Sequence, residues 1–285
     1  MPSSTNWWSR LNWGAAMKTG LLAALLLASC FAARTASAQP FPFNDAGVTN
    51  GHWHLNSKDV AANDKIFVGM GGKAFQAGGR QRVLFPGVMI ILDQAPGTPP
   101  PTGPTEGSVV NHVGFIVNNV QEQVAKWKAG GVPVSPGNNG RLDQAFVNTP
   151  DGLRIEILED KTQSMPIRSE HVHFFLPESA IAQSQAWYGR VFGAKAGVRN
   201  NAPVANLPGV QLRFTKADTA QARTKGRVLD HIGFDVKDLK AFIKTLEAQN
   251  IKLDRPYSVN DSGIGIAFIT DPWGTYIEIN ERPGQ

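Results

Sequence analysis

Hydrophobic and polar residues alternate in four short segments of the chain, and a histidine stands near the start of each. In the last segment Ile232, Phe234 and Val236 share one face, whereas His231 and Asp235 lie on the other. This period of two predicts a β-strand with one apolar face and one face that carries histidine. The four segments are GHWHLNSKD at 51–59, NHVGFIVNN at 111–119, EHVHFFLPE at 170–178 and DHIGFDVKD at 230–238.

A helical pattern follows these strands. Within residues 239–246 apolar residues recur with the spacing of one helix face, and Asp238 stands where an N-cap is expected. The same face follows the second strand at Val120, Val124 and Trp127. Because the apolar face of a strand can pack on such a helix, we expect the histidines on the opposite face of the sheet.

A turn and a final strand close each repeat. Residues 271–278 read DPWGTYIE and residues 149–156 read TPDGLRIE, and both predict a tight turn followed by a strand that bears glutamate. The glutamate position holds Ile91 and Arg213 in the other two repeats. The chain is therefore predicted to contain four βαβββ modules and to be an α+β protein. The leading histidines are 60, 59 and 60 residues apart: His52, His112, His171 and His231.

Four modules of this length suit two domains of ordinary size. We expect neighbouring modules to pair, with one domain at 47–160 and another at 168–282. The polar segment 160–169 is then the linker between domains. The proline-rich stretch 94–107 and the polar stretch 215–227 join the two modules within each domain.

The first 38 residues have the pattern of a secretory signal peptide. Arg10 and Lys18 precede the apolar run 21–33, and the small residues 36–38 offer a cleavage site. A competing interpretation is a lipoprotein signal, since residues 27–30 end in Cys30, the only cysteine, which would carry a lipid anchor. Both interpretations predict a periplasmic or secreted protein.

Composition limits the remaining classes of function. The chain has 285 residues, of which 42% are hydrophobic and 18% charged, and this is typical of a globular protein. A single cysteine excludes a disulfide framework and a cysteine-rich zinc site. Removal of residues 1–38 lowers the net charge from +5 to about +2, and no dense basic run remains. Nucleic acid is therefore not an expected partner.

These motifs resemble the vicinal oxygen chelate (VOC) superfamily, which includes glyoxalase I, extradiol dioxygenases and bleomycin-resistance proteins. The resemblance covers nearly all of 47–282 and rests on the strand histidines, the turn and the glutamate-bearing strand. It implies two tandem VOC domains, in which paired modules form a cup-shaped mixed sheet around a divalent metal. By position it implies one metal site at His171, His231 and Glu278, and another at His52, His112 and Glu156.

The chemistry of these residues supports a metal site independently. Two imidazoles and one carboxylate suit Fe(II) or Mn(II), with Zn or Ni as alternatives, and they leave positions open for a substrate. A carboxylate on an otherwise apolar strand also requires a cation. A single strand histidine is usually structural, but matched histidines in every module favour ligands.

The pattern departs from known members of the superfamily at several positions. Ile91 and Arg213 replace the second glutamate of a glyoxalase-type site. Phe146 and Phe268 stand where extradiol dioxygenases usually carry a tyrosine, and no histidine lies between 232 and 285.

Three further residues are candidates for catalysis. His54 and His173 each lie two residues after a leading histidine, on the same strand face, and could exchange protons beside the metal; the alternative is a rim residue without a role. Arg213 could hold a substrate carboxylate or enolate oxygen, unless it is an ordinary strand arginine.

We therefore expect an exported, metal-dependent enzyme that acts on a small oxygenated molecule. Dioxygenase-like chemistry is slightly preferred, because the triad leaves positions open for the substrate and O₂. The alternatives are a glyoxalase-like lyase or isomerase and a non-catalytic binding protein of the resistance type.

Overall fold

The structure is a computed structural model that describes residues 41–94, 99–260 and 263–282. The predicted signal peptide and Cys30 lie outside the described residues. Within the described part of the chain, no helix combines the length and apolar character needed to cross a membrane.

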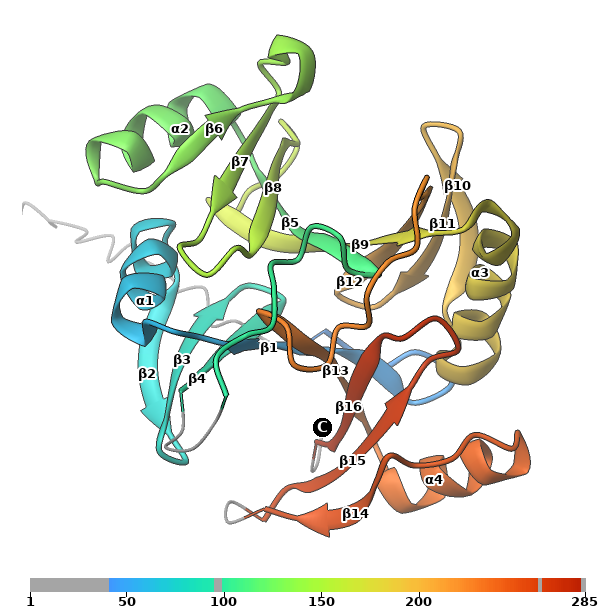
Figure 1. Cartoon of the computed structure of the whole chain (residues 1–285). Coiled ribbons are helices and arrows are strands. Elements are labelled where there is room, and N and C mark those ends of the chain that lie inside the picture. Colours follow the sequence, from blue (N-terminus) through green and yellow to red (C-terminus); the bar gives the residue numbers. More distant parts are fainter. Residues whose placement is uncertain (1–40, 95–98, 261–262, 283–285) are drawn as a thin grey trace, which may run out of the picture. The chain divides into compact units, whose positions relative to one another are not determined.

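Four modules follow one another along the chain, and each consists of a strand, a helix and three further strands (Figure 1). The first comprises β1 (Val48–Asn56), α1 (Val60–Gly69), β2 (Lys73–Ala77), β3 (Arg80–Phe85) and β4 (Val88–Asp93). The second comprises β5 (Val110–Val117), α2 (Val120–Ala129), β6 (Val134–Pro136), β7 (Gln144–Asn148) and β8 (Arg154–Glu159), with a 3₁₀ turn, η1 (Asn138–Gly140), after β6. The third comprises β9 (Ile167–Leu176), α3 (Glu178–Phe192), β10 (Lys195–Arg199), β11 (Ala202–Leu207) and β12 (Val210–Lys216). The fourth comprises β13 (Leu229–Val236), α4 (Leu239–Ala248), β14 (Arg255–Val259), β15 (Gly265–Thr270) and β16 (Tyr276–Glu281).

The α4 helix begins at the residue that the sequence indicated. Asp238 caps α4 by accepting a hydrogen bond from Ala241 N at 2.9 Å, and Asn119 caps α2 in the same way. The α3 helix follows Pro177 without a side-chain cap and ends at Gly193, which has a φ of +69°. The predicted strand–helix order of the modules, and with it the α+β class, is confirmed.

The pairing of modules differs from the prediction. The strands form two eight-stranded mixed sheets, with the orders β14-β15-β16-β13-β1-β4-β3-β2 and β10-β11-β12-β9-β5-β8-β7-β6. The first sheet thus joins modules one and four, and the second joins modules two and three. The expected linker at 160–169 is instead a short connection within one sheet, because β5 and β9 are antiparallel neighbours. The longer segments after β4 and β12 pass from one sheet to the other.

One hydrophobic core lies between the sheets and the helices. Trp53 of β1 contacts Phe115 of β5 edge to face, with ring centroids 5.4 Å apart, and both side chains are fully buried. Backbone hydrogen bonds also join the sheets, from Asn50 N to Pro208 O and from Ser169 N to Pro86 O. Trp127 and Trp187 belong to this core, and Trp127 lies on the apolar helix face that the sequence predicted. Since side chains alternate along a strand, the histidines lie on the face of each sheet away from this core.

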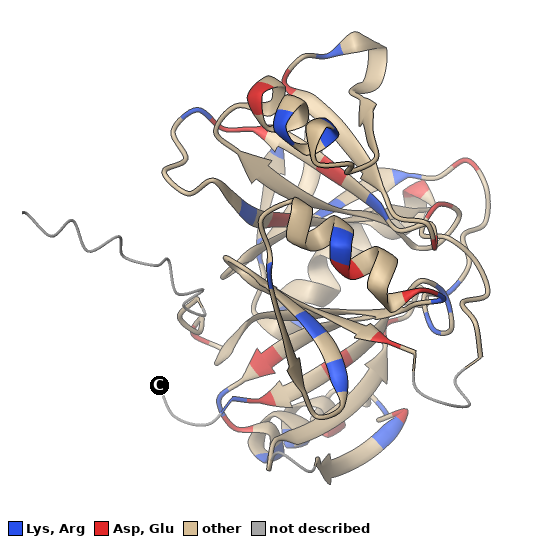
Figure 2. Cartoon of the chain, turned by 90° about the vertical axis from the view of Figure 1, so that its left-hand side faces the viewer, with Lys and Arg blue, Asp and Glu red and all other residues tan. Residues whose placement is uncertain are grey.

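Charged residues of both signs are interspersed along the ribbon in Figure 2. On the histidine-bearing face of each sheet, a buried glutamate lies among imidazoles.

Candidate metal centres

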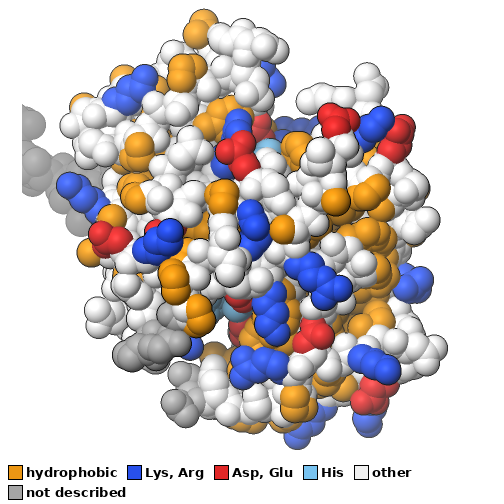
Figure 3. Space-filling view, viewed as in Figure 1, with side chains coloured by type: hydrophobic (Ala, Val, Ile, Leu, Met, Phe, Trp, Pro, Cys, Tyr) orange, Lys and Arg blue, Asp and Glu red, His pale blue; other side chains and the backbone are white. Residues whose placement is uncertain are grey.

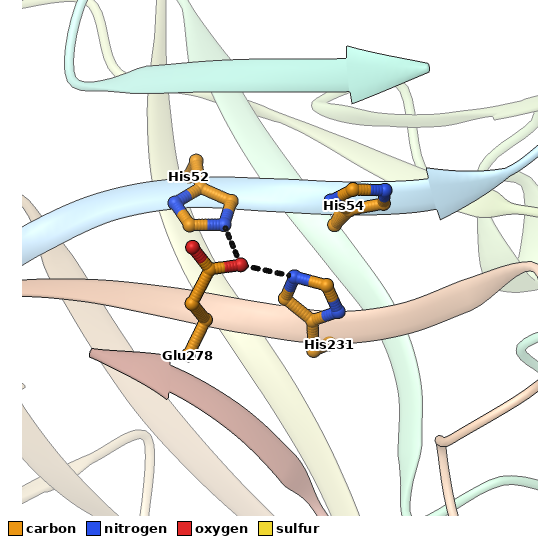
Figure 4. Close-up of side chains that lie close together, drawn as sticks. All are labelled: His52, His54, His231 and Glu278. Atoms are coloured by element: carbon orange, nitrogen blue, oxygen red, sulfur yellow. Dashed lines mark hydrogen bonds and ion pairs between the residues drawn. The ribbon is translucent and has the colours of Figure 1, made fainter. Parts of the chain in front are cut away.

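Two clusters of imidazole and carboxylate groups lie on the concave faces, one on each sheet. His52 and His54 of β1, His231 of β13 and Glu278 of β16 form site A, which is shown in Figure 4. The equivalent residues of the other sheet form site B: His112, Glu156, His171 and His173. Within each cluster, one ligand atom from each of the four residues lies within 4.8 Å of all the others.

The composition of the sites corrects the grouping of residues implied by sequence. All six predicted metal ligands lie in a cluster, but His52 joins His231 and Glu278, whereas His171 joins His112 and Glu156. The cause is the module pairing, since β1 lies beside β13 and β9 beside β5. His54 and His173, predicted as neighbours of the metal, lie within the clusters.

Each carboxylate lies between two imidazoles. In site A, Glu278 Oε2 is 2.8 Å from His231 Nε2 and 3.5 Å from His52 Nε2 (Figure 4). In site B, Glu156 Oε2 is 3.1 Å from His171 Nε2 and 3.4 Å from His112 Nε2. The Nε2 atoms of His52 and His171 are buried and have no hydrogen-bond partner. Such unsatisfied buried nitrogens are costly for a protein unless an ion or ligand meets them.

Two glycines make room for the imidazoles. Gly233 of β13 lies opposite His52, and a Cβ atom at this position would come within 2.1 Å of the His52 ring. Gly114 of β5 lies opposite His171, and its added Cβ would come within 1.9 Å of that ring. These glycines explain why the second and fourth modules read H-x-G, whereas the first and third read H-x-H.

Polar residues next to the histidines hold the second ring nitrogen. Asp230 Oδ1 is 2.6 Å from His231 Nδ1, Glu170 Oε2 is 2.5 Å from His171 Nδ1, and Asn111 Oδ1 is 2.8 Å from His112 Nδ1. Partners of this kind fix the orientation of a ligand imidazole and leave its other nitrogen for the metal. Our sequence reasoning missed them, although a polar residue precedes three of the four leading histidines and could have signalled this role.

The local charges favour an ionised carboxylate in each site, and burial favours the unprotonated imidazole at His54, His112 and His173, whereas Asp230 and Glu278 outweigh burial and raise the pKa of His231. Burial would raise the pKa of Glu278, but His52 and His231 outweigh it and lower that pKa; His112 and His171 do the same to Glu156. Burial, with nearby His231, lowers the pKa of His54 to about 4. An unprotonated imidazole and an ionised carboxylate are the forms that bind a metal.

The cluster dimensions fit one ion in each site. Two ligand atoms, each about 2.1 Å from the same ion, are at most about 4.2 Å apart. The observed limit of 4.8 Å exceeds this only slightly, so small side-chain rotations would bring the atoms to ligand distance. The donor set of imidazole and carboxylate suits Fe, Mn, Zn or Ni ions.

A cavity of about 260 Å³ opens beside site A, and His52 is part of its wall. Its apolar lining includes Leu84 and Met89, and its polar lining includes Asp235 and Arg282, whose side chains are 3.2 Å apart. Histidine atoms are visible from outside beside acidic atoms at two places in Figure 3. The face of site A therefore has space for a small molecule next to the imidazoles.

A family model described as "Glyoxalase/Bleomycin resistance protein/Dioxygenase superfamily" matches residues 171–279. The match contains His171, His231 and Glu278, and the described modules outside it repeat the same order of elements. Over residues 171–279 the resemblance inferred from the histidine motifs is confirmed.

Two solved structures share the fold over about four fifths of the chain. Glyoxalase I from Zea mays has a TM-score of 0.61 and 15% sequence identity, covering 82% of this chain and 92% of that one. A candidate dioxygenase from Bacillus subtilis has a TM-score of 0.60 and 15% identity, covering 83% and 86%. No curated protein matches the sequence.

The position that carries a second carboxylate in glyoxalase-type members is occupied differently here. Ile91 lies next to His54 across β1 and β4, and Arg213 lies next to His173 across β9 and β12. The Arg213 guanidinium contacts Glu170 through Nη2 and lies 3.8 Å from Glu156 Oε2. Arg213 therefore supports the carboxylate that orients His171, and any hold on a substrate remains a prediction.

Aromatic residues surround His231 and His112 where extradiol members of the superfamily carry a tyrosine. Phe268 contacts His231 with centroids 5.4 Å apart, and Phe146 contacts His112 at 6.5 Å. Neither side chain can transfer a proton. Tyr276 is stacked on Phe268, and its ring centroid lies 5.7 Å from that of His231.

Proposed function

We propose that this protein is a metal-dependent enzyme that acts on a small oxygenated organic molecule. The observation that carries the proposal is the pair of buried Nε2 atoms of His52 and His171, which make no hydrogen bond and lie only 3.5 Å and 3.1 Å from an ionised glutamate. A divalent cation would satisfy these nitrogens and compensate the buried carboxylate charge. Fe(II) and Mn(II) suit the donors best, and Zn or Ni are alternatives.

The proposed substrate reaches the metal through two neighbouring oxygen atoms. The cavity beside His52 supports a small molecule, since its volume of about 260 Å³ lies near the lower end for ligand pockets. The bound ion would act as a Lewis acid on the chelated oxygens or would activate O₂. Burial favours the unprotonated form of His54 and His173, and this form either accepts a proton from the substrate or binds the ion; the two roles exclude each other.

Two reaction classes are compatible with these residues. A dioxygenase is our first candidate, as the His/His/Glu triad leaves positions for both the substrate and O₂. A glyoxalase-like lyase or isomerase is the second, and the phenylalanines at the tyrosine position favour it because they cannot assist ring cleavage.

Two measurements test this proposal. The chain would be purified with Fe, Mn, Zn and Ni present, and its bound metal would be quantified; we expect up to two ions per chain. Oxygen uptake and product formation would then be followed with catechols, hydroquinones and 2-oxo-aldehyde adducts. Turnover that is lost in Glu278→Gln supports an enzyme. Tight ligand binding without turnover would favour the resistance-type binding protein, and a lack of bound metal would refute the metal proposal.

We also propose that the protein is exported, on the basis of its N-terminal sequence. Mass spectrometry of the mature protein is the test. A chain that begins at Gln39 supports cleavage by an ordinary signal peptidase, whereas a lipid on Cys30 supports a membrane-anchored lipoprotein. An uncleaved chain found only inside the cells would contradict export.

A further inference from the structure

The histidines at the H-x-H positions are the least explained members of the two sites. His54 lies directly opposite His231 in the β1–β13 ladder, with ring centroids 4.4 Å apart. His173 lies directly opposite His112 in the β5–β9 ladder, with centroids 4.5 Å apart. His54 in site A and His173 in site B therefore occupy equivalent positions, although they belong to different modules and different sheets.

In each of these rings Nε2 contacts a side chain outside the cluster. His173 Nδ1 is 3.0 Å from His112 Nε2, while His173 Nε2 is 2.8 Å from Thr215 Oγ1. In site A, His54 Nε2 is 3.4 Å from Asp93 Oδ2, which leaves Nδ1 for the interior of the cluster. The leading histidines have the reverse arrangement, because neighbouring side chains hold Nδ1 of His231, His171 and His112.

The position of these rings also matches a missing ligand. The last strands of modules one and three carry Ile91 and Arg213 instead of glutamate, and neither side chain binds a cation. His54 and His173 are the cross-strand neighbours of these residues. Each imidazole thus lies beside the position from which the lost carboxylate would have reached the ion.

We propose that each site binds its ion through four protein ligands, and that the fourth is Nδ1 of His54 in site A and of His173 in site B. This inference rests on the proposed metal function and deepens it. Each ion is then held by three imidazoles and one carboxylate rather than by a triad.

The fourth ligand changes which substrates and reactions the site accommodates. A six-coordinate ion with three protein ligands keeps three open positions, whereas one with four keeps two. A substrate that chelates through two adjacent oxygens fills both of them. This favours Lewis-acid chemistry on the chelated substrate, as in a lyase or isomerase, over chemistry that also needs a position for O₂.

The test counts imidazoles in one site at a time. The double variant His112→Ala/Glu156→Gln removes site B, and Cu(II) is added to the remaining site A. Pulsed electron paramagnetic resonance detects the remote nitrogen of each coordinated imidazole, so it reports ligand number independently of activity. We expect three imidazoles in this background and two after His54→Ala, with a Cu(II) dissociation constant at least 10-fold higher.

The matched control is Ile91→Val, which changes the residue beside His54 but no ligand and should keep three imidazoles. Unfolding midpoints verify that each variant is folded. If His54→Ala does not fold, His173→Ala in the background His52→Ala/Glu278→Gln provides the same count for site B.

The outcomes separate the two proposals. Two imidazoles in the background protein, unchanged by His54→Ala, would refute the fourth ligand and leave the metal triad intact. No Cu(II) binding to the wild-type chain would overturn the proposed function itself. A count of three imidazoles in the background protein that falls to two in His54→Ala supports both the metal function and the fourth ligand.

Discussion

Substitution of Gly233 by alanine should disable site A without touching a ligand residue. The added Cβ would lie 2.1 Å from Cε1 and Nδ1 of His52, whereas carbon atoms in contact are usually about 3.5–4.0 Å apart. The ring would have to move by about 1.5 Å, and metal–ligand distances tolerate only about 0.2 Å. Gly233 is not among the residues with positive φ, so the effect would come from the ring and not from backbone strain.

We expect Gly233→Ala to weaken metal binding at site A by about 10–100-fold, which corresponds to about 1.4–2.8 kcal/mol. Overpacking would also destabilise the metal-free fold by about 1–3 kcal/mol. Site B should keep its affinity, because Gly114 and His171 belong to the other sheet. Isothermal titration with Mn(II) or Zn(II) should therefore change from two comparable sites to one strong and one weak site.

The matched control is Gly130→Ala at the end of α2, where an added Cβ would meet nothing closer than 3.5 Å. Its titration should equal that of the wild type. Gly114→Ala should weaken site B in the way that Gly233→Ala weakens site A, since its Cβ would lie 1.9 Å from the His171 ring. If a folded Gly233→Ala protein binds two ions with wild-type affinity, our account of the His52 position is wrong.

Three further predictions concern stability. Asp271→Ala should lower the free energy of unfolding by about 3–5 kcal/mol in urea titrations, because the buried carboxylate accepts hydrogen bonds from three backbone N–H groups and from the Tyr188 hydroxyl. Tyr188→Phe removes only one of these bonds and should lower the free energy of unfolding by about 1 kcal/mol. Equal losses in the two variants would contradict this reasoning. Burial would raise the pKa of Glu170, but His171, Arg213 and Arg199 lower it below 4.5. The ionised Glu170 therefore stabilises the folded protein fully above pH 4.5, and this stabilisation is lost as the pH falls below 4.5. In the absence of metal, the free energy of unfolding of Glu170→Gln should fall less between neutral and acid pH than that of the wild type. Removal of metal by a chelator should lower stability by about 2.7 kcal/mol per site, relative to protein held at an ion concentration 100 times the dissociation constant; an unchanged melting temperature would exclude tight binding.

Strands, helices and the histidine face could be predicted from the sequence because each depends on local periodicity. Asp238 begins α4, and Ile232, Phe234 and Val236 are buried as their alternation indicated. The side chains that contact Nε2 of His54 and of His173 could not be assigned in this way. Asp93 and Thr215 reach His54 and His173 only through cross-strand neighbours, and such contacts depend on register between strands far apart in sequence.

The order of the modules within the sheets is the part that periodicity could not decide. Modules one and three each supply two histidines, whereas modules two and four each supply one histidine, a glutamate and the glycine that accommodates a ring. A complete site therefore needs one module of each kind, which excludes pairing one with three or two with four. Pairing neighbours in sequence, as we expected, and the observed pairing of one with four and two with three both satisfy this rule.

Connection length distinguishes these two arrangements. Residues 160–166 form the shortest of the three connections between modules, and they join β8 to β9 within one sheet. The segments 94–109 and 217–228 are longer and pass between sheets. Short connections favour neighbours in one sheet, because a short chain cannot reach across the core to another layer. The spacing of the histidines is uniform and does not indicate which modules share a candidate metal site. The unequal lengths of the segments between the modules do indicate it.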